Sequence, residues 1–543
     1  MVEQTAGTKV FARRSSGLVR VMSPYSAFAY NVLNIGVIFP FVYLTTLAAY
    51  PNASLTLGIL ITGAFTALLA VVYAGLASAM PRTGGDYIFQ SRTIGGWIGF
   101  AIVMTMIGTF FFQWQAIGGW LTSLLGLSPM FTGLGLSLNN TSLLNLGTWF
   151  STPTGIWIVT AVASTIAIAV LIKSFAWFVK AQWIMWYGFL LSWVVMVVMF
   201  FVTPNATFIG NFNHASAVLA NGTTTTTGNY YQSIISKAVV GGFIPAAGFS
   251  LIGTFLVAPV ALTSLGWVGY AQEQAGEIQG ANVLKNQLFI NLGGGLTATV
   301  MMMVLAFALT NTVGQGWLSA ASYYSASNSM AVLPWFSTLA EVLTNNPVLI
   351  VLMMIGIFLN AIQVVFNVAI GWTRVAVAMS IDGVLPKWVS RVSDRTHTPV
   401  LAQVFYLIVA GFGMGYVYNF VPGYTGYALA VTAVATVMYI GTALGGAIFP
   451  WVKKQLYESS PIAKYKIASV PLITICGVIA AGFSAVMLYD YLVYPFLGVN
   501  SLISEEIVTS IFVAWVAYYF IRRWYLRRRG IDLELAYKEI PPI

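Results

Sequence analysis

The chain has 543 residues, of which 58% are hydrophobic and only 7% are charged. Soluble globular domains carry about 25% charged residues, so this composition excludes a chain folded wholly in water and predicts an integral membrane protein. The net charge of +10 is spread over alternate predicted loops, which argues against a nucleic-acid-binding protein.

Apolar segments recur along the whole chain. Each is near or above the length of about 20 residues that a membrane-spanning helix needs. The twelve predicted spans are 24–48, 55–79, 97–126, 154–173, 181–203, 245–271, 287–313, 347–378, 400–420, 425–450, 468–496 and 505–525. The predicted fold is therefore an all-α polytopic membrane protein.

Lysine and arginine residues indicate the orientation of these spans. If the N-terminus is cytoplasmic, 23 of the 24 basic residues fall on the cytoplasmic side, and Lys237 falls outside. The polar start of the chain has no pattern of a cleavable signal peptide. We therefore expect a multi-pass protein of the plasma membrane with both termini in the cytoplasm.

Three long polar loops, 127–153, 204–242 and 314–346, are predicted on the outside and are expected to be ordered only in part. Within the last, Leu333–Leu343 fits a short surface helix or a plain loop equally well. The outer segments also carry all the Asn-x-Ser/Thr sequons, which make a glycosylated exterior plausible. These possible glycosylation sites are Asn52, Asn139, Asn140, Asn205 and Asn221.

The first and sixth spans are irregular at their centres. The first contains Asn34, Gly36 and Pro40, and the sixth contains Pro259 and Gly266. Broken spans are tolerated where they line a cavity, and a pair of them in corresponding positions marks the binding site of many transporters. Two halves of five spans each would have opposite orientations, as an inverted repeat requires. The predicted domains are a tail 1–22, repeats 23–242 and 243–452, two further spans within 453–525 and a tail 526–543.

Three motifs resemble the amino acid–polyamine–organocation (APC) superfamily of secondary transporters. Met80–Phe89 (MPRTGGDYIF) follows the second span, and Ala275–Ile278 (AGEI), with Lys285 after it, follows the sixth. Arg374–Trp388 (RVAVAMSIDGVLPKW), followed by Thr398–Val400, lies at the end of the eighth. The resemblance implies a leucine-transporter-like fold, with a 5+5 inverted repeat plus two C-terminal helices, and transport by alternating access.

In this family the breaks in the first and sixth spans hold the substrate, so the resemblance implies a binding site there. The corresponding residues here are Asn34, Ile35, Gly36, Val37, Ser264, Leu265, Gly266 and Trp267. The first break departs from the family's G-(S/A/T)-G pattern, because one glycine of the pair is replaced. No carboxylate is predicted deep in the sixth span. The substrate class is therefore expected to be a neutral or zwitterionic amino acid or a related small metabolite, rather than an organic cation or polyamine.

Charged residues of the three motifs share the predicted cytoplasmic face. They are candidates for ion pairs that hold a cytoplasmic gate shut: Arg82, Asp86, Glu277, Arg374 and Asp382. The alternative is a set of solvated surface charges, each worth less than about 1 kcal/mol.

No cofactor is predicted; a proton and a sodium ion are the two candidate coupling ions, and whether transport is coupled to either stays open. The candidates to bind such an ion are Lys180, Asn360, Asn367 and Thr373. Lys180 also fits a positively charged anchor at the membrane surface, and the polar residues also fit hydrogen bonds between helices.

Two other function classes were compared with a transporter. A membrane-embedded enzyme needs a cluster of nucleophile, base or metal ligands, and the sequence shows none; Cys476 is the only cysteine, so no metal site is expected. A channel or a ligand sensor on the same fold stays open. The expected partners are a small-molecule substrate and membrane lipids but no nucleic acid, and the oligomeric state is not predicted.

Overall fold

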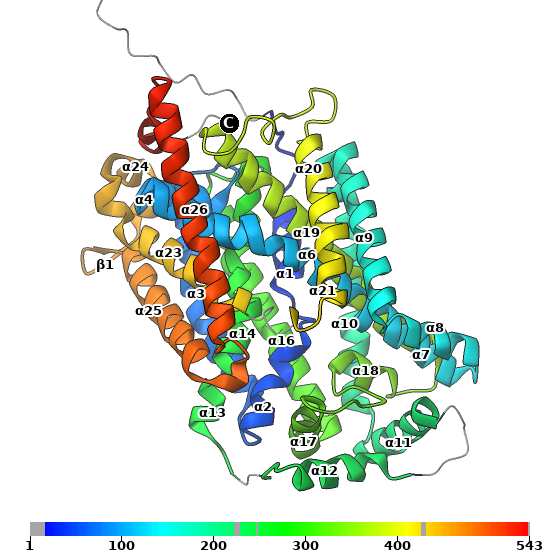
Figure 1. Ribbon diagram of the computed structural model, residues 1–543. Helices are drawn as coiled ribbons and strands as arrows, with labels where there is room; N and C mark the ends of the chain where they lie inside the picture. The colour runs from blue at the N-terminus through cyan, green and yellow to red at the C-terminus, as the bar shows by residue number, and fades with distance from the viewer. Residues whose placement is uncertain (1–16, 222–227, 246–247, 425–429, 541–543) are drawn as a thin grey trace, which may run out of the picture.

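The computed structural model describes residues 17–221, 228–245, 248–424 and 430–540. These residues form a bundle of long helices with one two-stranded hairpin, β1 (Lys466–Ile467) and β2 (Val470–Pro471) (Figure 1). Residues 17–22 and 533–540 lie at the same end of the bundle, which we call the terminal face. The opposite end, which carries α11 (Asn205–Asn221), α12 (Tyr230–Val240) and α17 (Gln315–Ser325), is called the distal face.

Eleven helical stretches of the described chain are long and apolar enough to cross a membrane, and a bent pair of helices makes a twelfth. The bent pair is α1 (Pro24–Ile35) with Pro40–Ala49, which holds η1 (Pro40–Tyr43) and α2 (Thr45–Ala49). Seven of the others are single helices: α3 (Leu55–Ala79), α9 (Pro153–Lys173), α10 (Phe175–Val202), α19 (Pro347–Ile381), α23 (Ala430–Val452), α25 (Leu472–Val493) and α26 (Leu502–Arg528). Two are made of several helical segments: Gly96–Ser137, with α5 (Gly96–Val103), η2 (Met104–Phe110), α6 (Phe111–Leu121), η3 (Thr122–Leu127) and α7 (Ser128–Ser137), and Leu251–Glu277, with α13 (Leu251–Phe255), α14 (Val257–Leu265) and η4 (Gly266–Glu277). Two more are also segmented: Leu284–Val313, with α15 (Leu284–Leu288), η5 (Phe289–Gly293) and α16 (Gly294–Val313), and Val400–Phe420, with α20 (Val400–Tyr406), η6 (Leu407–Met414) and α21 (Gly415–Phe420). The prediction of an all-α polytopic membrane protein is confirmed, with eleven or twelve candidate spans, although residues 425–429 of the tenth predicted span lie outside the described residues.

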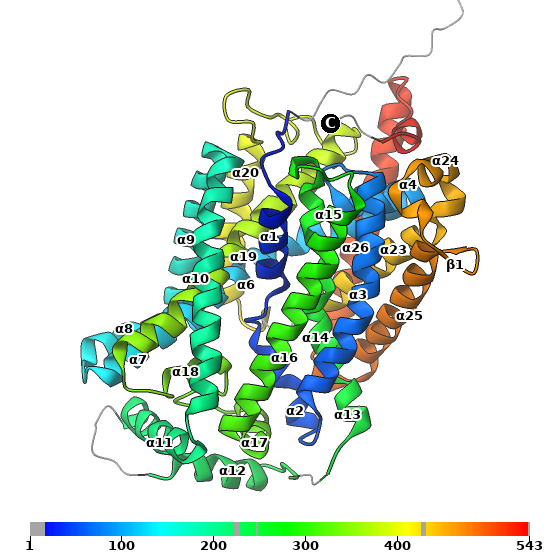
Figure 2. The same ribbon diagram turned by 180° about the vertical axis from the view of Figure 1, so that it is seen from behind.

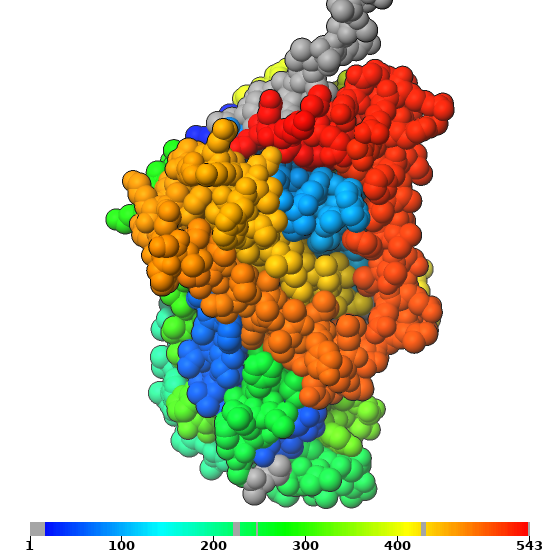
Figure 3. Space-filling model, turned by 90° about the vertical axis from the view of Figure 1, so that its left-hand side faces the viewer, coloured from blue at the N-terminus to red at the C-terminus, as the bar shows by residue number. Residues whose placement is uncertain are grey.

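The broken helix α1 lies at the centre of the bundle. It packs against η4, η5, α16 and α19, and Figure 2 shows it between α10 and α16. Its buried side chains point in all directions, so α1 has neighbours on every side. By contrast, α26 is mostly exposed and runs along the outside, where it packs mainly on α5; Figure 3 shows it along the right-hand side, apart from α24 (Lys454–Ser459). The division into two inverted repeats stays a prediction.

The three long outer loops contain more structure than the sequence predicts. They hold α7 with α8 (Thr141–Trp149), α11 (Asn205–Asn221) with α12 (Tyr230–Val240), and α17 (Gln315–Ser325) with α18 (Phe336–Glu341). The expectation of partial order was therefore wrong for most of each loop. The expected alternative of a short helix within Leu333–Leu343 is present as α18.

The polar residues that suggested disorder act instead as helix caps. Asn140 accepts hydrogen bonds from the first turn of α8, Asn229 from that of α12, and Asn346 from that of α19. Asparagine side chains satisfy amides that a helix start leaves without partners. Asparagine in these segments therefore marks where helices begin.

Candidate substrate site

The break in α1 lies where the chain turns into the left-handed region. Helix α1 is capped by Ser23 and ends at Gly36, which has φ 77° and ψ 53°. Glycine adopts this conformation without a steric penalty because it has no Cβ atom. Pro40 then starts η1, and the two halves of the span meet at an angle of 61°. The predicted break near Gly36 is thus present.

This break leaves backbone amides without partners. Among the described residues, the amides of Gly36, Val37 and Ile38 donate to no protein oxygen. A right-handed residue followed by a left-handed one, as at Ile35 and Gly36, arranges successive amides into a concavity that binds anions. The break can therefore hold a carboxylate group through the backbone alone.

The sixth predicted span is distorted rather than open. It changes from the α-helix α14 to the 3₁₀ segment η4 at Gly266, and Trp267 leaves the helical region with φ −78° and ψ 17°. A Cβ atom on Gly266 would lie 2.2 Å from the ring of Tyr439. Gly266 is therefore needed for close packing, and the irregularity predicted for this span is present as a kink at Trp267 rather than as an open break.

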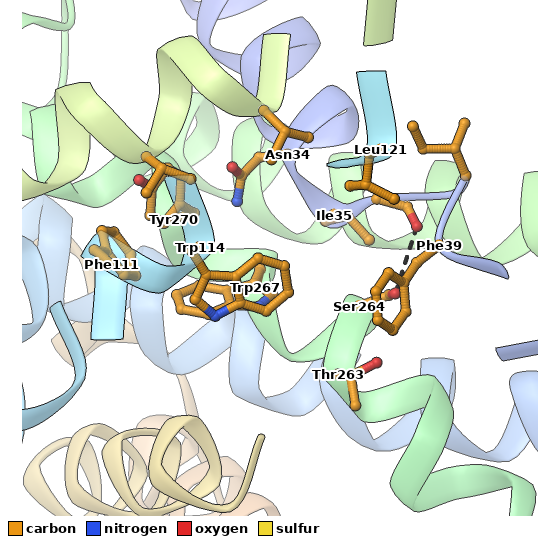
Figure 4. A pocket seen from close by; sticks show the side chains of 14 residues that line it. Asn34, Ile35, Phe39, Phe111, Trp114, Leu121, Thr263, Ser264, Trp267 and Tyr270 are labelled. Atoms are coloured by element: carbon orange, nitrogen blue, oxygen red, sulfur yellow. Dashed lines mark hydrogen bonds between the residues drawn. The ribbon is translucent and has the colours of Figure 1, made fainter. Parts of the chain in front are cut away.

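A cavity lies between the break in α1 and the start of η4. Its volume is about 40 Å³, room for about three water molecules at the ~10–15 Å³ that each needs. Figure 4 shows Ser264 and Trp267 from the α14–η4 segment facing Asn34 and Ile35 from α1. The lining residues are Asn34, Ile35, Gly36, Ile38, Phe39, Phe111, Trp114, Leu121, Thr263, Ser264, Trp267, Tyr270, Val364 and Val368. None of them is charged.

Five of the eight predicted substrate residues line this cavity: Asn34, Ile35, Gly36, Ser264 and Trp267. Val37, Leu265 and Gly266 are not among the lining residues. The side chains of Val37 and Leu265 are buried in the surrounding core. Their neighbours Gly36 and Ser264 hold the two walls together, since the Ser264 hydroxyl donates to the Gly36 carbonyl at 3.4 Å (Figure 4).

Trp267 is the centre of the aromatic wall. Its ring centroid lies 5.6 Å from those of Tyr270 and Tyr439, 5.8 Å from Phe111 and 6.3 Å from Trp114. Edge-to-face and tilted arrangements at these distances are favourable between aromatic rings. The wall opposite the backbone amides is therefore rigid and apolar.

Two of the predicted coupling-ion residues touch the break in α1. Asn367 donates to the Asn34 side chain at 3.1 Å, and Asn360 donates to the Leu33 carbonyl at 2.9 Å. Both are on α19 and fully buried. The Asn360 oxygen has no partner among the described residues. The Asn360 side chain thus replaces a backbone hydrogen bond that the end of α1 lacks, and Asn367 holds the Asn34 side chain.

The other two coupling-ion candidates lie elsewhere. Thr373 donates to the carbonyls of its own helix at Ala369 and Ile370. Lys180 is exposed, with its ammonium group 5.2 Å from the Trp177 ring centroid. That position fits the alternative reading of Lys180 as a surface anchor.

Two buried ion pairs lie between the cavity and the terminal face. Arg374 of α19 makes two parallel hydrogen bonds to Glu277 at the end of η4, at 2.8 and 2.9 Å. Arg92 of α4 (Gly85–Thr93) lies 2.7 Å from Asp382, the residue that caps α19. All four side chains are buried, so these are not the solvated charges of the alternative reading. We call these two pairs the terminal gate.

The remaining gate candidates lie differently from the sequence hypothesis. Arg82 is half-buried and donates to the Pro81 carbonyl at 3.2 Å. Asp86 lies in the first turn of α4, where it accepts a hydrogen bond from the Tyr73 hydroxyl at 2.7 Å. Asp86 forms no ion pair with an arginine or lysine among the described residues. The partner of Asp382 in the terminal gate is Arg92, which the sequence hypothesis omitted.

The structure also buries a carboxylate that sequence reasoning missed. Because the sixth span was predicted to end at 271, Glu273 was assigned to a loop. In the structure η4 continues to Glu277, and Glu273 is 1% exposed. The signal available in the sequence was the uncharged context of Glu273, which follows the apolar run of the sixth span.

The predicted glycosylation sites all lie on distal elements. Asn139 and Asn140 are exposed before α8, and Asn52 is half-buried before α3. Asn205 is exposed at the start of α11, and its amide donates to the Thr312 carbonyl at 2.7 Å. Asn221 ends α11. Among the described residues, no group of three or more His, Cys, Asp or Glu side chains is placed to hold a metal ion.

No curated protein matches the chain. The protein family described as amino acid permease matches residues 25–517, a range that begins in α1 and ends within α26. The match includes the cavity and the terminal gate, and the family points to a membrane transporter rather than an enzyme. The chain belongs to the amino acid permease family.

Proposed function

We propose that the protein is a secondary active transporter of small neutral amino acids, and that it works by alternating access across the plasma membrane. The terminal face would be cytoplasmic and the distal face extracellular, as the distribution of Lys and Arg favours. The observation that carries the proposal is the cavity at the break in α1, which has free backbone amides and no charged lining residue.

The chemistry of the cavity favours a zwitterion. The amides of Gly36, Val37 and Ile38 would hold the carboxylate, and the Asn34 side chain and nearby carbonyls would face the ammonium group. A second fixed charge on the substrate would be buried without a partner, which is costly. This favours neutral amino acids over lysine, glutamate or a polyamine.

The size of the cavity favours a small side chain. A volume of about 40 Å³ between the rings of Trp267, Phe111 and Trp114 leaves space for few heavy atoms. Glycine, alanine and serine therefore fit better than leucine or phenylalanine.

Closures on both sides support alternating access. On the terminal side lie the buried pairs Arg374–Glu277 and Arg92–Asp382. On the distal side, Phe41 stacks on Trp120 at 6.1 Å, and Trp120 meets Trp335 beside α18 at 5.4 Å. Transport requires these two closures to open in turn.

The test is uptake of radiolabelled substrates into proteoliposomes, with glycine, alanine, serine, leucine, phenylalanine, lysine and putrescine as the panel. The expected result is saturable uptake of the three small neutral amino acids and little uptake of the charged ones. Saturable binding without flux would replace the transporter proposal with a sensor. Preferred uptake of lysine or putrescine would overturn the proposed substrate class.

A further inference from the structure

Three buried polar contacts join α4, η4 and α19 in pairs. Arg374–Glu277 joins α19 to η4, and Arg92–Asp382 joins α4 to the end of α19. The third contact joins α4 to η4, and it is made by Asp86 and Glu273. The first two contacts match an arginine with a carboxylate. The third brings two carboxyl groups together.

The Asp86–Glu273 contact is direct and buried. The backbone amide of Asp86 donates to one oxygen of Glu273 at 3.2 Å, which brings the two carboxyl groups close enough to interact. Asp86 is 3% exposed and Glu273 is 1% exposed. Two ionised carboxylates buried side by side repel each other, so this contact favours a proton on one of them.

The hydrogen bonds around the pair indicate which carboxyl holds the proton. One oxygen of Asp86 accepts from the hydroxyls of Tyr73 and Thr442, which stabilises the ionised form of Asp86. The second oxygen of Glu273 has no partner among the described residues. The proton is therefore expected on Glu273, donated toward Asp86. Burial also raises the pKa of the Asp86 carboxyl, so the pair binds a proton more readily than exposed carboxyls do.

Among the described residues, no arginine or lysine forms an ion pair with either carboxyl. The titratable groups that interact with the pair are Tyr30 of α1, Tyr73 of α3, Tyr270 of η4 and Tyr439 of α23. The charged groups beyond them are Arg92 of α4 and Arg374 of α19, which are paired with Asp382 and Glu277 instead. A proton is thus the available counter-charge.

A second feature connects the pair to the substrate cavity. The Tyr439 hydroxyl is buried, has no hydrogen-bond partner among the described residues, and interacts electrostatically with Asp86. The ring of Tyr439 packs edge-on against Trp267 of the cavity wall, with centroids 5.6 Å apart. Tyr439 therefore lies between the substrate cavity and the carboxyl pair.

We propose that Asp86 and Glu273 form a proton-binding site, that the shared proton holds α4 against η4 while the terminal side is closed, and that the proton leaves when this side opens. This inference rests on the proposed transport function and names its coupling ion. In the release step the O–H bond of Glu273 breaks, the proton passes to a water molecule on the terminal side, and both carboxylates remain ionised and apart. No electrons are transferred.

The test uses proteoliposomes of the full chain with Glu273→Gln, Asp86→Asn and the control Glu458→Gln, which changes an exposed glutamate on α24. Two transport assays are compared: accumulation driven by a pH gradient, and counterflow of labelled against unlabelled alanine without a gradient. At one-to-one coupling, each pH unit supports about tenfold accumulation. Glu273→Gln is expected to abolish this accumulation and to retain counterflow, whereas Glu458→Gln keeps both.

A direct readout separates this inference from the transport proposal. Infrared difference spectra between low and high pH are expected to show a protonated carboxyl band in the wild type that is lost in Glu273→Gln. If the wild type transports no amino acid but shows this band, the transport proposal fails and the proton site stands.

The inference is overturned if Glu273→Gln accumulates alanine under a pH gradient as the wild type does. It is also overturned if the band persists in this variant, or if a sodium gradient and not a pH gradient drives uptake. If Glu273→Gln does not fold, Asp86→Asn takes its place in the transport and infrared measurements, with the same expected results and the same results that would overturn the inference.

Discussion

The guanidinium group of Arg374 faces the carboxylate of Glu277 through two hydrogen bonds of 2.8 and 2.9 Å, and both side chains are no more than 1% exposed. A buried charge without its partner is strongly destabilising, typically by about 3–5 kcal/mol. This pair therefore joins α19 to η4 in one state of the protein, and its opening has a large electrostatic cost.

Exchange of the two charges tests the role of this pair. Arg374→Glu and Glu277→Arg each place like charges together in the core, so each alone is expected to lower the melting temperature and abolish uptake. The double variant restores opposite charges and is expected to recover part of both. Measurement of melting temperature and alanine uptake for all four proteins checks this. A double variant no better than the worse single variant removes the gate role.

The second ion pair predicts a difference between two neighbouring arginines. Arg92→Gln leaves the buried Asp382 carboxylate without its cation, at an expected cost of about 3–5 kcal/mol of unfolding free energy. Arg82 is half-buried, so Arg82→Gln is expected to cost less than about 1 kcal/mol. Thermal unfolding of both variants in the same detergent measures this difference, and equal losses would contradict it.

The left-handed conformation of Gly36 predicts the effect of one methyl group. A Cβ atom at this position would meet no atom closer than 3.8 Å, so Gly36→Ala is strained by its backbone and not by a clash. The left-handed conformation costs an L-residue about 1–2 kcal/mol. Gly36→Ala is therefore expected to displace the unpaired backbone amides at the break in α1 and to raise the KM for alanine. Gly482→Ala, in open space within α25, is the control; a similar KM for the two variants would argue against the amide site.

The aromatic wall predicts a strong effect at Trp267. Trp267→Ala removes contacts to four rings, each worth about 0.5–1.5 kcal/mol beyond the buried area, and opens the cavity. We expect a KM for alanine raised by about tenfold or more, since every 1.4 kcal/mol changes affinity tenfold, with larger amino acids now accepted. The control is Trp451→Ala, which changes a tryptophan that is 63% exposed at the end of α23. Unchanged selectivity in Trp267→Ala would contradict the assignment of this wall.

A pH dependence is expected from Glu341 in α18. Burial raises the pKa of this carboxyl well above its usual value, although the Thr132 hydroxyl donates to it at 2.7 Å. The folded state therefore binds the proton more tightly than the unfolded state does. The resulting stability is fully present below the unfolded pKa of about 4.3 and is lost as pH rises through the folded pKa.

Glu341→Gln is expected to flatten this decline. Melting temperatures of the wild type and the variant across acidic to neutral pH measure the difference. Parallel curves would show that Glu341 does not titrate with folding.

The membrane spans were predictable because the length of an apolar segment and the side on which Lys and Arg lie are properties of whole segments, not of single residues. Helix α3, predicted at 55–79, has the bounds Leu55–Ala79. The break at Gly36 was also predictable, because Gly36 and Pro40 together remove the means to continue a helix. The distal helices were not predicted, because Asn140 and Asn346 fit a cap as well as a loop.

The segments that form the site were predictable from the sequence, but the residues that contact one another within it were not. Which arginine meets Asp382 depends on the turn of α4, and no local pattern distinguishes Arg92 from Arg82. Glu273 was missed because the 3₁₀ segment η4 extends the sixth span beyond its apolar residues. In the same way, Gly266 fits both an unwound span and close packing on Tyr439, and only the packed structure distinguishes them.

The most direct test of the account is a structure of the protein determined with bound alanine. The account predicts the substrate in the cavity between Gly36 and Trp267, with its carboxylate within hydrogen-bonding distance of the amides of Gly36, Val37 and Ile38. A substrate bound elsewhere, or an α1 that continues as an unbroken helix through Gly36, would contradict it.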